Sequence, residues 1–283
     1  MNEQLQSQRV VIAVAPNGGR RTEVDHPGIP LTTSELARTA AECLDAGAAM
    51  IHVHVRRPDG RHLLDANAYR QVIDAIRAEV GDRLVIQITT EALGLYVPSE
   101  QIAVLKAVRP EAVSLALREL APDETAEPAF AEALAWMKRE NVSPQVILYD
   151  PAEALRLAAM ISRGLVPWPD IPVLYVLGRY TVSQTSRPAD LLPFLGPGAP
   201  RFSHWSVCAF GRHEAACVTA AALLGGHIRV GFENNLYLPD GALASGNADL
   251  VEAVTTAIRK LGYVPCDAAG ARVLADASTR TRE

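Results

Sequence analysis

Two histidines spaced two residues apart are the first residues in this chain that could do chemistry together. His52 and His54 lie in the apolar run Met50–Arg56, MIHVHVR, which the sequence predicts as a buried β-strand. Alternate residues of a strand point to the same face, so both imidazoles share one side with Arg56. Neutral imidazole is a favoured zinc ligand, and the pair could hold a divalent metal ion. Two hydrogen-bonded core histidines are the alternative.

The elements that would position these histidines alternate between short apolar strands and longer helical patterns. We expect strands at residues 9–15, 50–56, 84–88, 112–117, 145–149, 173–177, 203–209 and 227–232. Helical patterns separate them. One helix is expected to begin near Thr32, where Thr32 and Glu35 resemble a capping box, and to end at Gly47. Another is expected to follow Asp65.

Eight strands alternating with helices favour a (β/α)8 barrel, formed as a single domain over residues 1–283 with a small C-terminal helical extension. A doubly wound open sheet is the alternative. It usually brings a phosphate-binding fingerprint after its first strand, and the turn APNGGRRT does not match G-x-G-x-x-G. The barrel is therefore preferred.

Composition favours a soluble cytoplasmic protein without nucleic-acid or membrane partners. Of 283 residues 49% are hydrophobic, and the net charge is only −5, without long runs of like charge. No apolar run reaches the roughly 18 residues of a membrane span. The four cysteines form no C-x-x-C pair and, with no signal peptide in view, are expected to be thiols in a reducing compartment.

A third metal ligand is expected at Glu233. In a closed barrel the last strand and the histidine strand both flank the first strand, and active sites lie at the C-terminal ends of the strands. Two histidines and one carboxylate with an open position are a common catalytic zinc set. An ion pair of Glu233 with Arg229 or Arg56 is the alternative role. His204, His213 and His227 are competing ligand candidates.

Other polar side chains gather at the expected strand ends, which favours a site over isolated core polar groups. They are Asn17, Arg20, Gln87, Thr89, Thr90, Glu91, Ser114, Tyr149, Asp150, Ser203, His204, Ser206, Arg229, Asn234 and Asn235.

Several segments of the chain resemble the β-keto acid cleavage enzymes. They are VVIAVAPNGGRRT, IPLTTSELARTAAECLDAGAAMIHVHVRRPDGRHLLD, LVIQITTEA and GHIRVGFENN, and the likeness spans roughly residues 9 to 265. The resemblance implies a (β/α)8 barrel that holds a divalent metal, usually zinc, and commonly forms a homotetramer. The implied reaction converts a β-keto acid and acetyl-CoA into acetoacetate and a new acyl-CoA.

The same resemblance assigns roles by motif. His52, His54 and Glu233 match the metal ligands of the family, and Arg229 matches an arginine that handles the keto acid. Thr89 lies where the family usually has a substrate-binding serine. Ser114 lies where the family often has a threonine, and Arg56, on the expected face of the histidines, completes the predicted substrate-binding set.

Three positions depart from the family pattern. Asn234 occupies the catalytic position where the family usually has an aspartate, and an amide cannot accept a proton as a carboxylate can. Ile147 replaces a pocket glutamate of the aminohexanoate-cleaving members. The run LGRYTVSQ replaces a glycine-rich loop, which could alter how CoA is held.

Arg20 is a fourth departure and suggests a substrate class. It falls where the aminohexanoate-cleaving members have a glutamate that meets the substrate ammonium. A cation there, together with the loss of the acidic side chain at Ile147, would favour a β-keto acid with a distal carboxylate. A solvated loop residue or a contact with a CoA phosphate is the alternative for Arg20.

The sequence therefore favours a zinc-dependent β-keto acid cleavage enzyme. Two alternatives remain open. One is a metal-dependent C–C lyase, hydrolase or decarboxylase that does not use CoA. The other is a catalytically weak metal-binding homologue, which the asparagine at position 234 in place of an aspartate would explain.

Overall fold

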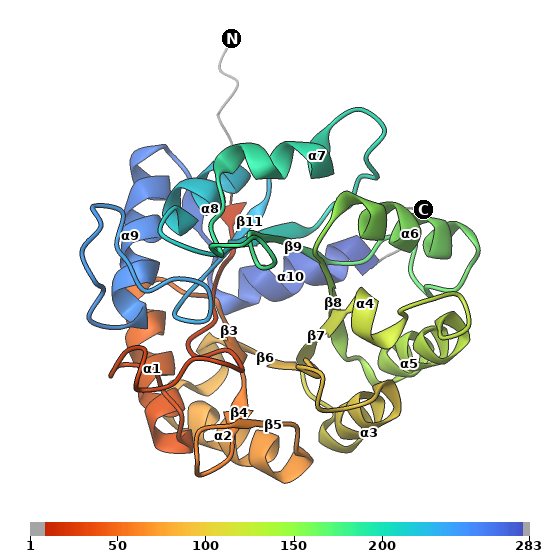
Figure 1. The fold of residues 1–283 in the computed structure, drawn as a ribbon, viewed down its shortest axis with the longest axis horizontal. Helices are drawn as coiled ribbons and strands as arrows, with labels where there is room; N and C mark the ends of the chain where they lie inside the picture. The colour runs from red at the N-terminus through yellow and green to blue at the C-terminus, as the bar shows by residue number, and fades with distance from the viewer. Residues whose placement is uncertain (1–8, 280–283) are drawn as a thin grey trace.

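Eight short apolar strands close into a parallel barrel in the computed structural model, which describes residues 9–279 (Figure 1). Around the barrel their order is β10-β11-β2-β3-β6-β7-β8-β9, so the predicted (β/α)8 fold is confirmed. The strands are β2 (Ile12–Val14), β3 (Met50–Val53), β6 (Val85–Thr89), β7 (Ala112–Ala116), β8 (Ser143–Leu148), β9 (Val173–Leu177), β10 (Trp205–Ala209) and β11 (His227–Val230). The ends of the predicted domain, residues 1–8 and 280–283, lie outside the described residues.

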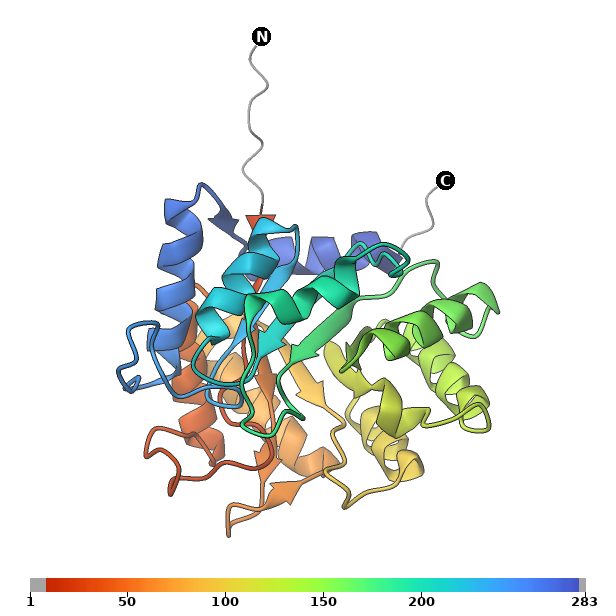
Figure 2. The same cartoon turned by 45° about the horizontal axis from the view of Figure 1, so that its top comes forward.

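Helices surround the barrel (Figures 1 and 2). They bury the outward apolar side chains of the strands. They are α1 (Thr33–Ala46), α2 (Ala66–Val80), α3 (Pro98–Val108), α4 (Leu117–Leu120), α5 (Glu127–Glu140), α6 (Pro151–Ser162), α7 (Leu192–Leu195), α8 (Glu214–Leu223), α9 (Asn247–Lys260) and α10 (Ala268–Thr279), with short 3-10 turns at Gly81–Arg83 and Pro188–Leu191. Among the described residues, no helix is both long and apolar enough to cross a membrane.

Local signals fix where the first helices begin and end. The Thr32 hydroxyl accepts from the Glu35 backbone N–H, and the Glu35 carboxylate accepts from the Thr32 N–H, so the predicted capping box of α1 is confirmed. Asp65 caps α2 through the N–H of Ala68. Gly47 ends α1 with φ of 112°, and a Cβ there would lie 2.9 Å from the Thr255 hydroxyl, so both conformation and space require glycine.

The histidine strand is shorter than predicted. It leaves the barrel after Val53, and β4 (Val55–Arg56) pairs antiparallel with β5 (His62–Leu63), so the predicted continuous strand to Arg56 is wrong. The break is held by Asn17, whose amide donates to the His54 carbonyl at 2.9 Å and accepts from the His54 N–H at 3.3 Å. A side chain thus replaces the strand ladder at His54.

The amino-terminal end of the barrel is closed by the C-terminal helix. Apolar residues at the amino ends of four strands, Val11, Ala49, Val85 and Ala112, form one cluster with Cys266, Ala268 and Ala271. The predicted C-terminal helical extension is therefore present as α10. Nearby, β1 (Arg9–Val10) pairs in parallel with β12 (Val264–Pro265), a short ladder that the sequence did not predict.

Two of the competing ligand candidates, His204 and His227, also lie at the amino ends of their strands, away from His52. Their rings pack in a tilted arrangement with centroids 4.5 Å apart, and His227 Nδ1 accepts from the Val11 N–H. Burial lowers the pKa of His204 to about 4. Burial, with a smaller contribution from His204, lowers the pKa of His227 to about 3. Both imidazoles are therefore neutral packing groups near neutral pH.

We expect acid to destabilise the fold through this pair. The unfolded chain binds protons on both histidines below about pH 6.5, whereas the folded chain does so only near pH 4 and 3, so the free energy of unfolding falls as pH drops through that window. The slope contributed is at most roughly 1.4 kcal/mol per pH unit for each imidazole. Urea unfolding of the wild type and His204→Gln near pH 7 and pH 5 measures it. The variant should lose less stability on acidification, and the exposed His213→Gln serves as control; equal losses in wild type and His204→Gln would contradict the expectation.

Candidate metal centre

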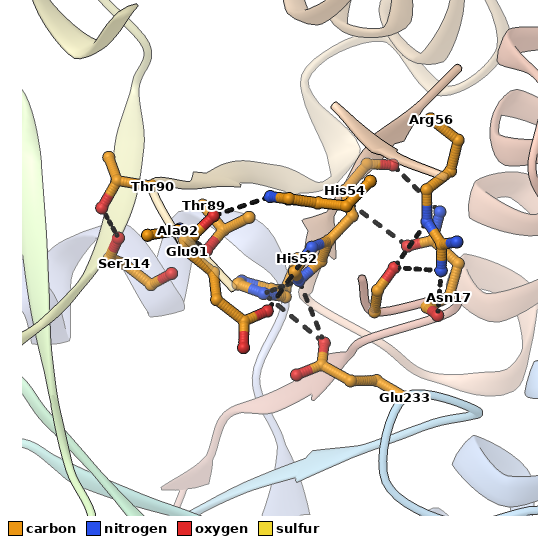
Figure 3. Close-up of polar contacts among 12 residues, drawn as sticks. Asn17, His52, His54, Arg56, Thr89, Thr90, Glu91, Ala92, Ser114 and Glu233 are labelled. Carbon is orange, nitrogen blue, oxygen red and sulfur yellow. Dashed lines mark hydrogen bonds and ion pairs between the residues drawn. The ribbon is translucent and has the colours of Figure 1, made fainter. Parts of the chain in front are cut away.

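Three side chains converge at the carboxyl end of the barrel (Figure 3). His52 Nε2 lies 3.2 Å from His54 Nε2, and the Glu233 Oε2 atom lies 3.6 and 3.5 Å from them. Because β11 and β3 both pair with β2, barrel closure brings the distant residues together as expected. Among the described residues, these three form the one cluster with metal-ligand geometry.

The separations suit a metal ion. Ligand atoms about 2.0 to 2.1 Å from a tetrahedral zinc ion lie about 3.3 Å from one another. Glu233 Oε2 is buried and has no hydrogen-bond partner among the described residues, although it faces both imidazoles. A buried carboxylate oxygen is costly to leave without a partner, and a cation between the three atoms would satisfy it. The donor set fits zinc or a similar divalent ion.

Glycines allow Glu233 to reach the histidines. Gly231 follows β11 with φ of 138°, and a Cβ there would lie 2.3 Å from the Ala15 carbonyl oxygen. The Glu233 N–H then donates to that same oxygen at 3.1 Å. Gly18 has φ of 58° and a Cβ there would lie 2.6 Å from Glu233 Cγ. The loop after β2 therefore packs directly against the carboxylate side chain.

Arg229 sets the charge of Glu233. Burial opposes ionisation, but Arg229, whose Nη2 donates to Glu233 Oε1 at 2.8 Å, and the histidines outweigh it and hold the pKa of Glu233 well below its usual range. The ion pair with Arg229, which the sequence left open as the alternative role of Glu233, is thus present, and it uses only the Oε1 atom. Oε2 remains directed at the imidazoles.

A chain of amides orients His52. Its Nδ1 lies 2.8 Å from Gln87 Oε1, while Gln87 donates to Gln145 and Gln145 donates to the Ser206 hydroxyl. Because the Gln87 nitrogen is used by Gln145, its oxygen must accept, and the network assigns the ring proton to His52 Nδ1. Burial, followed by the charge of Arg229, lowers the pKa of His52 to about 3. The neutral ring presents its Nε2 lone pair to the centre.

Of the other predicted site residues, some line one of two cavities and some line neither. Thr89, Arg229 and Glu233 line the inner cavity beside the histidines, and Arg20 lies exposed at an outer cavity that shares Glu233. Asn234 and Ser114 are fully buried and line neither cavity. Instead, Asn234 Oδ1 accepts from Arg229 Nη2 at 3.1 Å.

Arg56 is not placed beside the histidines as expected, because the strand ends before it. Its guanidinium donates to the backbone carbonyls of Asn17, Gly18, Arg21 and Gly60. It lines neither cavity. The side chain therefore ties the loop after β2 to the β4–β5 hairpin.

Two charged residues line both cavities: Arg179, which the sequence interpretation missed, and Glu91, which it counted among the polar residues at strand ends without giving it a role. Glu91 follows β6, and Arg179 lies in the loop after β9; Phe210 and Glu233 are the other shared residues. The available signal was position alone, because both follow a barrel strand within two residues of its end.

Comparisons with known proteins show which family this chain resembles. The sequence model of the beta-keto acid cleavage enzyme family matches residues 9–275. The chain is 30% identical over 260 residues to the 3-keto-5-aminohexanoate cleavage enzyme of Fusobacterium nucleatum subsp. nucleatum, covering 90% of this chain and 93% of that enzyme. It is 25% identical over 279 residues to the 3-oxoadipate:acetyl-CoA acetyltransferase of Cupriavidus necator, covering 95% of each.

Solved structures repeat the fold. The binary complex of ObcA with oxaloacetate aligns with a TM-score of 0.69 at 18% identity, covering 88% of this chain and 67% of that chain. A type I 3-dehydroquinate dehydratase from Clostridium difficile aligns with a TM-score of 0.57 at 12% identity, covering 91% and 98%. At these identities the likeness supports the barrel alone.

We expect Gln87→Leu to weaken zinc binding by roughly 10- to 100-fold, because His52 loses the acceptor that fixes its tautomer. Gln87→Glu keeps an acceptor oxygen and should bind zinc at least as tightly as the wild type. Competition with a chromophoric chelator measures both affinities. Wild-type affinity in the leucine variant would show that the amide chain does not orient the ligand.

Proposed function

The chain belongs to the beta-keto acid cleavage enzyme family, and we propose that it converts a β-keto acid and acetyl-CoA into acetoacetate and a new acyl-CoA. The main support for this proposal is the convergence of His52, His54 and Glu233 in a cavity that Arg229 also lines. The relative from Cupriavidus necator is named for acetyl transfer with acetyl-CoA, which supports the same co-substrate here.

We propose that His52, His54 and Glu233 hold zinc or another divalent ion. Such an ion, when bound, polarises a ketone and stabilises the negative charge of an enolate. Arg229 lies beside these ligands, and its Nε–H is buried without a partner among the described residues. It can donate to a substrate carboxylate. Its raised pKa, which the neighbouring Cys208 and Glu233 favour against burial, keeps it charged.

Other residues of the inner cavity orient the substrate and exclude water. The Thr89 hydroxyl accepts from the Glu91 N–H at 3.0 Å, so its proton is free to donate to a substrate oxygen. Ile147, Val176 and Phe210 form an apolar wall. Low local polarity strengthens the interaction of the bound substrate with Arg229. Arg56 and Ser114 line neither cavity and take no substrate contact in this proposal.

We propose that the substrate carries a distal carboxylate. The outer cavity is lined by Arg20, Arg21 and Arg179. Arg21 donates to the Phe232 carbonyl and Arg179 lies 3.9 Å from Glu91, whereas no hydrogen bond or ion pair of Arg20 occurs among the described residues. Arg20 is therefore available for an anion. A β-keto dicarboxylic acid would span from Arg229 to Arg20. From family membership we also propose a cytoplasmic homotetramer.

A panel of β-keto acids with acetyl-CoA tests the proposed reaction. We expect acetoacetate and an acyl-CoA from 3-oxoadipate, detected by mass spectrometry, and loss of both products in His52→Ala/His54→Ala together with loss of bound metal by elemental analysis. Both effects follow because two of the three proposed ligands are removed.

The other outcomes separate the alternatives. Cleavage or decarboxylation without acetyl-CoA would indicate a CoA-independent lyase. No turnover of any panel member at full metal occupancy would indicate a metal-binding homologue, and either result would overturn the proposed exchange.

Arg20→Glu should weaken the preference of the enzyme for a substrate with a distal carboxylate. We expect its kcat/KM ratio for 3-oxoadipate over 3-oxohexanoate to fall roughly 5- to 30-fold, since an exposed attraction becomes a repulsion worth about 1 to 2 kcal/mol in total. Arg61→Glu, an exposed arginine that lines neither cavity, is the matched control and should keep the ratio. An unchanged ratio in Arg20→Glu would remove the distal-carboxylate proposal and leave the exchange reaction standing.

A further inference from the structure

The proposed exchange requires a base, and Asn234 cannot supply one. A C–H bond of the carbon between ketone and carboxylate must break before that carbon can form a new bond to an acetyl group. A side-chain amide does not act as a base near neutral pH. Asn234 is in addition fully buried, lines neither cavity and has its oxygen bound to Arg229.

Most carboxylates near the centre are already engaged. Glu233 is held by Arg229 and faces both histidines. Glu119 accepts from the Ala92 N–H and from Gln101, and Glu214 accepts from the Gly231 N–H and from Asn235. Neither Glu119 nor Glu214 lines the two cavities.

Glu91 differs from these groups. Its backbone is fixed from both sides, because its N–H donates to the Thr89 hydroxyl and its carbonyl lies 2.7 Å from His62 Nε2. Its side chain is 16% exposed and lines both cavities. The carboxylate has no hydrogen bond within the described residues: His54 Nδ1 is 3.8 Å away and Arg179 Nη2 is 3.9 Å away.

Glu91 and Glu233 approach the histidine pair from separate elements (Figure 3). A substrate in the inner cavity would therefore have Glu233 and the histidines on one side. On another it would have the Glu91 carboxylate, which makes no hydrogen bond among the described residues and only two ion-pair contacts, at 3.8 and 3.9 Å. Resting on the proposed function, we propose that Glu91 is the catalytic base of this chain and takes the place of a carboxylate at position 234.

The step balances without a further reactant. The C–H bond of the keto acid breaks, an O–H bond forms on Glu91, and the electron pair passes into the enolate. The enolate carbon then attacks the thioester carbonyl of acetyl-CoA. The C–S bond of the thioester breaks and releases the CoA thiolate, which attacks the original ketone carbon. The bond between that carbon and the former enolate carbon then breaks, which releases the new acyl-CoA, and the resulting enolate of acetoacetate takes the proton back from Glu91. No net proton is consumed.

If Glu91 only oriented His54, its variants would behave differently. His54 Nδ1 is buried without a hydrogen-bond partner among the described residues, and a small movement of Glu91 would let the carboxylate accept from it. Glu91→Gln keeps an acceptor oxygen for that contact but cannot take up a proton. The glutamine variant therefore separates an orienting residue from a base.

Acetoacetate is the probe, because every turnover of the proposed reaction must form it. Zinc-loaded wild-type protein in D2O should accelerate exchange of the C2 protons of acetoacetate, followed by NMR. Glu91→Gln should reduce this acceleration by roughly 10²- to 10⁴-fold. Glu91→Asp keeps a carboxylate and should retain more exchange than Glu91→Gln, and the zinc content of both variants should equal that of the wild type.

Glu119→Gln is the matched control, since it makes the same chemical change outside the cavities, and it should keep wild-type exchange. Exchange in Glu91→Gln within about threefold of the wild type would overturn the assignment while leaving the proposed function intact. Loss of zinc in Glu91→Gln would overturn it in favour of a ligand role. Absence of exchange in the wild type would overturn both the base and the proposed exchange reaction.

Discussion

The buried contact between Arg229 and Glu233 is the interaction on which the rest of the site depends. Removing either partner would leave an uncompensated charge inside the barrel, at a cost of roughly 3 to 5 kcal/mol. The pairing uses Glu233 Oε1 and leaves Oε2 directed at His52 and His54. Asn234 holds the arginine from a second direction. One ion pair thus fixes the charge and the direction of the carboxylate.

Barrel closure places this pair beside the histidines. The neighbours β11, β2 and β3 bring together residues from the two ends of the chain, and glycines at 18 and 231 let the connecting loops approach closely. At the opposite end, α10 covers the strands with apolar side chains. The fold is therefore closed by packing at one end. At the other end, Arg229 Nε and Glu233 Oε2 have no hydrogen-bond partner among the described residues, and a substrate can meet them there.

The family pattern accounts for the proposed metal ligands of this chain better than for the group that would accept the substrate proton. A carboxylate is absent at Asn234, but Glu91 places one beside the same centre from the loop after β6, the strand that pairs with β3. Three arginines, Arg20, Arg21 and Arg179, add positive charge at the outer cavity. The barrel accommodates both changes because the carboxyl ends of its strands lie at one end of the fold, so a functional group can move between strands without a change of fold.

The sequence by itself determined the strand and helix alternation, the capping box at Thr32 and the spacing of His52 and His54, because periodicity, capping chemistry and residue spacing are local. The addition of Glu233 to this pair followed from the predicted closure of the barrel and from the family resemblance. Only the tertiary structure decided which side chains of the site already use their hydrogen-bonding groups within the protein and which do not. Arg56 is occupied by four backbone carbonyls, Asn234 is bound to Arg229, and Glu91 stands without a hydrogen bond among the described residues. These differences arise from contacts between strands and loops distant in sequence, which no local pattern encodes.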